Sequence, residues 1–224
     1  MIEPEINAEN IHYPHTSLVV LENTVNKGGG SCYTLEQIAP IAELCKANNL
    51  KLHLDGARLW NALVANNEST KAYGEVFDSI SICLSKGLGT PLGSLLLGDF
   101  DYIKQGRRLR KVFGGGMRQA GYMAAAGIYA LENNIARLEE DHHHAKQIAE
   151  ALLQKEFIGK MMPVETNILI FEVIDSYTPK EFCDTLRHHD VLCLPISATQ
   201  VRMVTHLDIT KEMVKNLIDV ITAL

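Results

Sequence analysis

Leu50-Lys51-Leu52-His53-Leu54-Asp55-Gly56-Ala57-Arg58 decides the fold, because a short apolar strand ends there in a carboxylate, a glycine and a guanidinium. Two similar stretches flank it, since residues 17–21 form a continuous apolar run and residues 77–84 a partly alternating one. Thr34-Leu35-Glu36-Gln37 is typical of a capped helix start, and residues 59–65 predict a short helix. Strands that alternate with helices at this spacing indicate parallel βαβ units, so we expect an α/β fold.

Three chemically useful side chains directly follow predicted strands. Ligands of such sheets bind beyond the carboxyl ends of the strands, where we expect Asp55, Arg58 and Lys86. The amine of Lys86 could form a Schiff base, although an ordinary solvated loop lysine would occupy the same position. Asp55 could keep a heteroaromatic nitrogen protonated, or it could cap the helix that follows. Arg58 could bind a carboxylate or form a surface ion pair.

The rest of the chain predicts one more strand, several helices and a second, smaller unit. Residues 95–97 indicate a fourth strand, residues 101–112 a basic helix, and residues 117–153 a long helix with a break near Asn133-Asn134. Gly114-Gly115-Gly116-Met117-Arg118 precedes the long helix, and its free N–H groups and Arg118 could bind phosphate. An α+β unit is indicated by strand-like residues 167–173, 191–194 and 201–205 and by helical residues 179–189 and 210–224.

Composition argues against several classes of protein. The chain has 224 residues, with 27 acidic and 21 basic side chains, and its formal net charge of −6 argues against a nucleic-acid partner. No apolar stretch suits a membrane-spanning helix, and the acidic N-terminus does not resemble a signal peptide. The five cysteines are an odd number without CxxC spacing, which indicates reduced thiols in a cytosolic protein.

The remaining motifs argue against a metal site and against dinucleotide and P-loop binding. His142-His143-His144 is expected on a solvated helix face rather than at a metal site, because consecutive helical residues do not face one another. The GxGxxG, GxxxxGK[ST], GxSxG and HExxH patterns do not occur.

Four segments together resemble the low-specificity L-threonine aldolases. They are His53-Leu54-Asp55-Gly56-Ala57-Arg58, Leu84-Ser85-Lys86-Gly87-Leu88-Gly89-Thr90-Pro91-Leu92-Gly93-Ser94, Gly114-Gly115-Gly116-Met117-Arg118-Gln119-Ala120-Gly121 and Arg202-Met203-Val204-Thr205-His206-Leu207-Asp208. These aldolases are fold type I, aspartate-aminotransferase-like enzymes that use pyridoxal 5'-phosphate, beside the aromatic amino acid β-eliminating lyases. The resemblance covers nearly the whole chain, in matching order.

The resemblance implies a role for each of four residues around the cofactor and the substrate carboxylate. Lys86 resembles the lysine that binds the cofactor covalently, and Asp55 resembles the aspartate that pairs with the pyridine nitrogen. Arg58 is similar to the arginine beside the cofactor and the substrate carboxylate. Arg202 is similar to the small-domain arginine that binds that carboxylate.

Three further residues receive roles in the same way. Arg118 and Lys111 resemble basic residues near the phosphate, where a neighbouring subunit contributes to the site. His12, in Ile11-His12-Tyr13-Pro14, is similar to a catalytic histidine near the substrate hydroxyl. No metal is implied.

The implied activity is the cleavage of L-threonine or L-allo-threonine into glycine and acetaldehyde, by breaking the Cα–Cβ bond. The partners expected are a small amino acid and further copies of the chain, in a cytoplasmic homodimer or homotetramer without nucleic acid or membrane. One alternative is β-elimination from an aromatic amino acid.

The other alternative is a catalytically incomplete fragment, because members of the family are longer and the missing part is N-terminal. We expect residues 1–130 to be the C-terminal portion of a large, parallel-rich cofactor-binding domain, and residues 131–224 a small α+β domain. Val25 also stands where the family usually has histidine, which bears on substrate preference.

Overall fold

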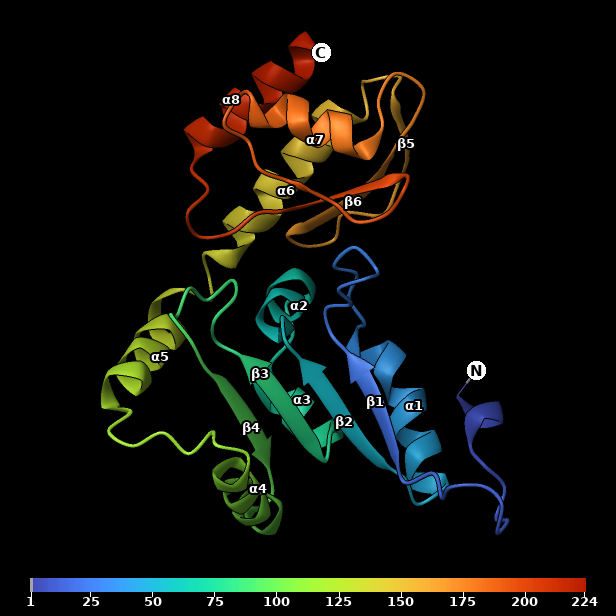
Figure 1. Ribbon diagram of the computed structural model, residues 1–224. Coiled ribbons are helices and arrows are strands. Elements are labelled where there is room, and N and C mark those ends of the chain that lie inside the picture. Colours follow the sequence, from blue (N-terminus) through green and yellow to red (C-terminus); the bar gives the residue numbers. More distant parts are fainter. Residues whose placement is uncertain (1) are drawn as a thin grey trace.

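Two four-stranded sheets organise the computed structural model, which describes residues 2–224 (Figure 1). The first sheet has the order β1-β2-β3-β4. Strands β1 (Leu18–Glu22), β2 (Lys51–Gly56) and β3 (Ser79–Cys83) are parallel, as the sequence predicts. Strand β4 (Ser94–Gly98) runs antiparallel to β3, so the simple parallel pattern ends there.

Helices α1 (Leu35–Ala47), α2 (Leu59–Asn66) and α3 (Thr70–Val76) pack with the first sheet around one apolar core. The predicted capping box of α1 is present, since the side chains of Thr34 and Gln37 each bond the other's backbone N–H. The seven-residue helix α3 has too short an apolar pattern to be predicted, although the Ser69 hydroxyl caps it.

The second sheet is antiparallel, with the order β5-β6-β8-β7. Its central strands are β6 (Ile168–Val173) and β8 (Gln200–Val204), flanked by β5 (Ile158–Met161) and the two-residue β7 (Leu194–Pro195). Helices α6 (Leu138–Leu152), α7 (Pro179–Arg187) and α8 (Lys211–Ala223) share a core with it. Phe171 and Phe182 lie at its centre, in an edge-to-face contact at 5.9 Å between ring centroids.

Helices α4 (Phe100–Val112) and α5 (Gly121–Asn133) connect the two sheets along the chain, after a short N-terminal 3-10 helix, η1 (Glu3–Glu5) (Figure 1). The helix predicted from residue 117 is really two helices, with the predicted break at Asn133-Asn134 confirmed. It also begins only at Gly121, because Met117 and Arg118 belong to the connecting loop. Within residues 2–224, no helix is both long enough and apolar enough to cross a membrane.

The histidine run corrects one sequence expectation. His142 and His144 are buried, at 5% and 1% exposed, and only His143 faces solvent. The ring Nε2 of His142 lies 3.1 Å from Nδ2 of Asn61, which joins α6 to α2. The solvated-face prediction is wrong because α6 is packed against α2 and α8 rather than exposed along one side. The division of the chain after residue 130 stays a prediction.

Candidate active site

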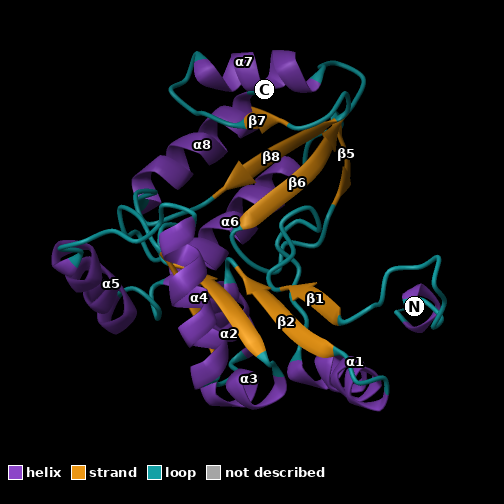
Figure 2. Cartoon of the chain, turned by 60° about the horizontal axis from the view of Figure 1, so that its bottom comes forward, coloured by secondary structure: helices purple, strands orange, loops and turns teal. Residues whose placement is uncertain are grey.

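The carboxyl ends of β1, β2 and β3 lie at one edge of the first sheet. The register pairs Glu22 with Asp55 across β1 and β2, and β3 ends at Cys83. Figure 2 shows the arrowheads of β1 and β2 pointing toward the second sheet. The site therefore forms where the ends of one sheet meet the loops and strands of the other.

Asp55 lies within β2 and does not cap the helix that follows. Its Oδ1 accepts a hydrogen bond of 3.1 Å from the N–H of Ala57, while its Oδ2 has no hydrogen bond within the described chain. The N-cap position of α2 belongs to Arg58, which provides no side-chain cap. The helix-cap alternative for Asp55 is therefore wrong, and one carboxylate oxygen stays available for a ligand.

Lys86 is exposed on a tight turn directly after β3. The N–H of Gly89 donates to the carbonyl of Lys86 at 2.8 Å, and Gly89 has a φ of +75°, a left-handed conformation that favours glycine. The Nζ of Lys86 donates to Sγ of Cys83 at 2.9 Å, and no acid pairs with it among residues 2–224. Its amine is therefore accessible and not neutralised.

Two guanidinium groups from distant parts of the chain meet on one neutral side chain. Nη2 of Arg202, on β8, donates to Oδ1 of Asn26 at 2.9 Å, and Nη1 of Arg58 donates to the same oxygen at 3.4 Å. Nε of Arg202 is buried without a hydrogen-bond partner. Neither arginine forms an ion pair within the described residues, so the surface ion pair considered for Arg58 is not formed.

The electrostatics of this pair favour an anion. Burial lowers the pKa of Arg58, and the positive charge of Arg202 lowers it further. Glu22, Cys83 and Asp55 act in the opposite direction but do not outweigh these effects. A carboxylate bound between the two guanidiniums would relieve their repulsion and accept their free N–H groups.

Asn26 is a site residue that the sequence analysis missed. It lies in the loop after β1, and its own N–H donates to Oε1 of Glu22 at 3.1 Å, which fixes the loop to the strand end. Only its place after a buried strand could have indicated it, and many loop asparagines share that feature.

The remaining predicted residues form no hydrogen bond or ion pair with this group among the described residues. His12, Lys111 and Arg118 are all exposed, and none of their side chains forms a hydrogen bond or ion pair within residues 2–224. The structure thus brings Asp55, Arg58, Lys86 and Arg202 to one place, and the roles of all seven residues stay predictions.

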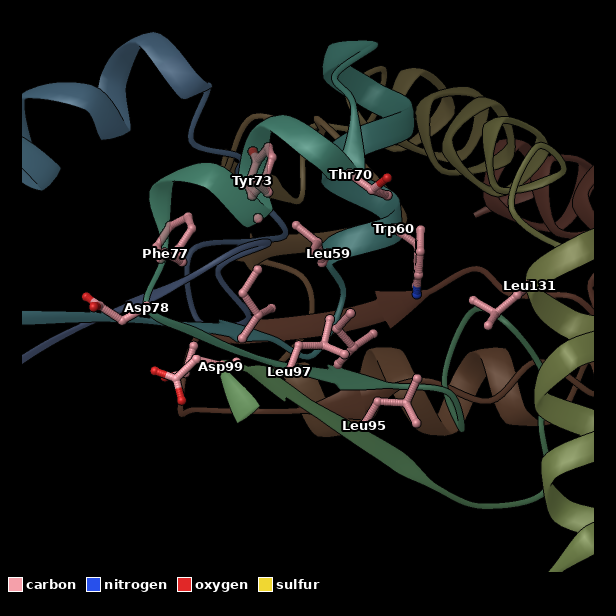
Figure 3. A pocket seen from close by; sticks show the side chains of 15 residues that line it. Leu59, Trp60, Thr70, Tyr73, Phe77, Asp78, Leu95, Leu97, Asp99 and Leu131 are labelled. Carbon is pink, nitrogen blue, oxygen red and sulfur yellow. The ribbon is translucent and has the colours of Figure 1, made fainter. Parts of the chain in front are cut away.

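A separate cavity of about 620 Å³ lies between α2, α3, β3 and β4 (Figure 3). Its walls are mainly apolar, and Figure 3 shows Trp60, Leu95 and Leu97 around it. None of the predicted site residues lines it.

The gathered residues fit the demands of pyridoxal phosphate. An unpaired amine suits covalent attachment, a free carboxylate oxygen suits a ring nitrogen, and unpaired guanidiniums suit a carboxylate. The groups expected at the phosphate, Lys111 and Arg118, are not joined to them within one chain.

Comparison with known proteins shows what the chain is similar to. Residues 1–176 match the sequence family described as beta-eliminating lyase. The chain is 46% identical over 209 residues to the low specificity L-threonine aldolase of Escherichia coli K12, covering 93% of this chain and 60% of that protein. It is 38% identical over 201 residues to low-specificity L-threonine aldolase 1 of Arabidopsis thaliana, covering 88% and 56%.

A solved structure shows the same fold. The threonine aldolase of Leishmania major superposes with a TM-score of 0.81 at 22% identity, covering 99% of this chain and 65% of that one. The expected fold type I architecture is therefore confirmed, while the chain spans only 56% to 60% of the length of the two curated relatives. With the family match extending over residues 1–176, the chain belongs to the beta-eliminating lyase family.

Proposed function

We propose that this chain is a pyridoxal phosphate-dependent carbon–carbon lyase that cleaves L-threonine or L-allo-threonine into glycine and acetaldehyde. The observation that carries the proposal is the meeting of Arg58 and Arg202 on the neutral oxygen of Asn26, close to Lys86 and Asp55. The names of the relatives support the same reaction.

The two arginines would bind and orient the substrate. A carboxylate held by both guanidiniums has a fixed position, and this fixes the bond that must break relative to Lys86. Pyridoxal phosphate, when bound, supplies a ring that withdraws electrons from the substrate Cα. The free oxygen of Asp55 would hold the proton on the ring nitrogen, and the Lys86 amine would bind the aldehyde carbon.

Cleavage of the Cα–Cβ bond requires loss of the proton from the β-hydroxyl. His12 is the base we propose for this step, and its exposed position leaves it free to approach a substrate. Val25 cannot accept a proton, so it cannot share this task.

We also propose a cytoplasmic homodimer or homotetramer with sites shared between subunits. Lys111 and Arg118 are exposed and not joined to Lys86 within the chain, so they are free to reach a phosphate bound to a second copy. Leu109, Phe113 and Tyr122, which are near them in the sequence, are exposed apolar side chains that suit a protein contact.

The test is to incubate the chain with pyridoxal phosphate, reduce it with borohydride and map the modified peptide. We expect the mass of the reduced cofactor on Lys86, and its loss in Lys86→Ala but not in Lys104→Ala, a matched change on exposed helix α4. A parallel sample should contain the longest reading frame that includes this sequence.

Products then separate the reactions. Glycine and acetaldehyde from L-threonine support the proposal, whereas pyruvate and ammonia from an aromatic amino acid would support β-elimination instead. Absence of an adduct on Lys86 in both samples would contradict the proposed cofactor role. An adduct without any product in the short chain, but with product in the long one, would identify this sequence as an incomplete piece.

A further inference from the structure

Cys183 and Cys193 face each other within the core of the second sheet. Cys183 is on α7, Cys193 immediately precedes β7, and their Sγ atoms are 3.2 Å apart. Both are buried, at 4% and 8% exposed. A disulfide bond has an S–S distance of about 2.05 Å, so the two sulfurs need to approach by only roughly 1 Å.

The other three cysteines lack such a neighbour. Cys32 bonds a backbone carbonyl, Cys83 lies beside Lys86, and Cys45 is buried in the first sheet's core without a second sulfur. Within the described chain, Cys183 and Cys193 are therefore the one pair of cysteines whose sulfur atoms are in contact.

We propose that Cys183 and Cys193 form a reversible disulfide that ties helix α7 to strand β7. In the oxidation by hydrogen peroxide, both S–H bonds break and one S–S bond forms. The two thiols give up two electrons and two protons, which convert the peroxide into two molecules of water. A dithiol reductant reverses the step by returning two electrons and two protons.

The surroundings determine how this pair behaves. Burial raises the pKa of both thiols, so the reactive thiolate is scarce at neutral pH and oxidation is slow. The same burial shields the finished bond from reductants. The disulfide is therefore expected to form slowly and to be reduced slowly.

The proposed disulfide lies next to strand β8, which carries Arg202. Leu194, which follows Cys193, pairs with Arg202 across β7 and β8. If Arg202 binds the substrate carboxylate, as the proposed function has it, the disulfide fixes the strand neighbouring that arginine. Formation of the bond itself does not depend on that function.

The experiment treats the full chain with hydrogen peroxide, blocks free thiols with iodoacetamide and maps tryptic peptides without reduction. Trypsin cleaves after Lys180, Arg187 and Arg202, so the two cysteines fall on separate peptides that only a disulfide can join. We expect a joined species of residues 181–187 and 188–202, two of the five thiols lost, and release by dithiothreitol. The melting temperature should rise by about 5 to 10 °C in the oxidised chain.

Matched variants separate this pair from general oxidation. Cys183→Ser and Cys193→Ser should each lose the joined species and the rise in melting temperature, whereas Cys45→Ser should keep both. The joined species in the unmodified chain decides the question even if a serine variant folds poorly. Alkylated or sulfinic Cys183 and Cys193 after peroxide treatment, without a joined species, would overturn the proposal.

Discussion

Asn26 is a neutral side chain between two cations, and this determines what the site can bind. Because its oxygen accepts from Arg58 and Arg202 without neutralising them, it holds both guanidiniums in place and leaves their charge for a ligand. A carboxylate at the same position would hold them equally well but would satisfy their charge.

Asn26→Asp is therefore expected to weaken substrate binding while the fold persists. An internal carboxylate of the same shape competes with that of the amino acid, so KM for L-threonine should rise roughly 10- to 100-fold, with a smaller change in kcat. Steady-state kinetics and urea unfolding measure the two effects. Asn26→Ala keeps the positive charge, so its KM should rise less; an unchanged KM in Asn26→Asp would show that the amino acid carboxylate binds elsewhere.

At the residue scale, sequence could identify side chains that stand directly after strands. Asp55 and Lys86 carry that signal because a strand end and a polar residue coincide in the sequence. Asn26 carries no such signal, since its role arises from contact with Arg202, which is 176 positions away. The residues next to His142 in the sequence likewise do not indicate that α6 is packed against α2 and α8.

Among the secondary structure elements, the turn after β3 places Lys86, and Gly89 makes that turn possible. An added Cβ at Gly89 would lie 2.6 Å from Cδ2 of Leu207, and the left-handed backbone there disfavours alanine. Gly89→Ala should cost about 1 to 2 kcal/mol of unfolding free energy and slow borohydride-trapped attachment of pyridoxal phosphate to Lys86. Urea unfolding and adduct mapping give both values.

Gly74→Ala is the control for that change. Gly74 lies inside helix α3, and an added Cβ there meets nothing within 4 Å. It should stabilise the chain by about 0.5 to 1 kcal/mol and leave adduct formation unchanged. Equal effects of the two substitutions would contradict the role assigned to the turn.

The contact between α2 and α6 predicts how stability depends on pH. Burial and, secondarily, Lys146 lower the pKa of His142 to about 4. The unfolded chain holds this histidine at a pKa of about 6.5 and binds its proton first on acidification. Stability from the neutral ring is therefore complete above about pH 6.5 and decreases by about 3 kcal/mol as the pH falls to about 4.

Urea unfolding at a series of pH values tests this dependence in matched variants. His142→Gln keeps a polar partner for Asn61 without titrating, so its stability should fall less between pH 6.5 and 4. His143→Gln, at the exposed neighbour, should retain the dependence of the unmodified chain. Parallel curves for both variants would mean that other groups cause the acid sensitivity.

Regular elements were predictable where the apolar pattern was long and the ends were marked. The capping box predicted the start of α1, and the apolar runs predicted β1, β2 and β3 to within a few residues. The direction of β4 was not predictable, because a short run of leucines is the same in either orientation. Strand β5 was not predicted from the sequence, because Ile158-Gly159-Lys160-Met161 has too few apolar residues.

On the scale of the whole molecule, one edge of the first sheet is strand β4. β4 pairs with β3 on one side only, and Leu95, Leu96 and Leu97 are 39% to 42% exposed. Unpaired strand edges with apolar side chains promote association between chains. This sheet edge is therefore expected to promote association of the 224-residue chain in solution.

Leu97→Lys should reduce concentration-dependent association while changing the unfolding free energy by about 1 kcal/mol or less. Light scattering over a range of concentrations measures the first effect. Ile128→Lys removes a comparably exposed apolar residue from helix α5, whose backbone is already bonded, and should have less effect. If the two variants behave alike, general surface hydrophobicity rather than the strand edge drives association.

Arg58 stands at the start of α2, beside the first sheet, and Arg202 lies in the second sheet, and both donate to the amide oxygen of Asn26. An amino acid bound by both guanidiniums would contact both sheets at once and restrict their motion relative to each other. Substrate binding would then lower the rate of amide hydrogen exchange where the two sheets meet. Binding of the substrate would therefore be detectable as reduced amide exchange, before the Cα–Cβ bond is broken.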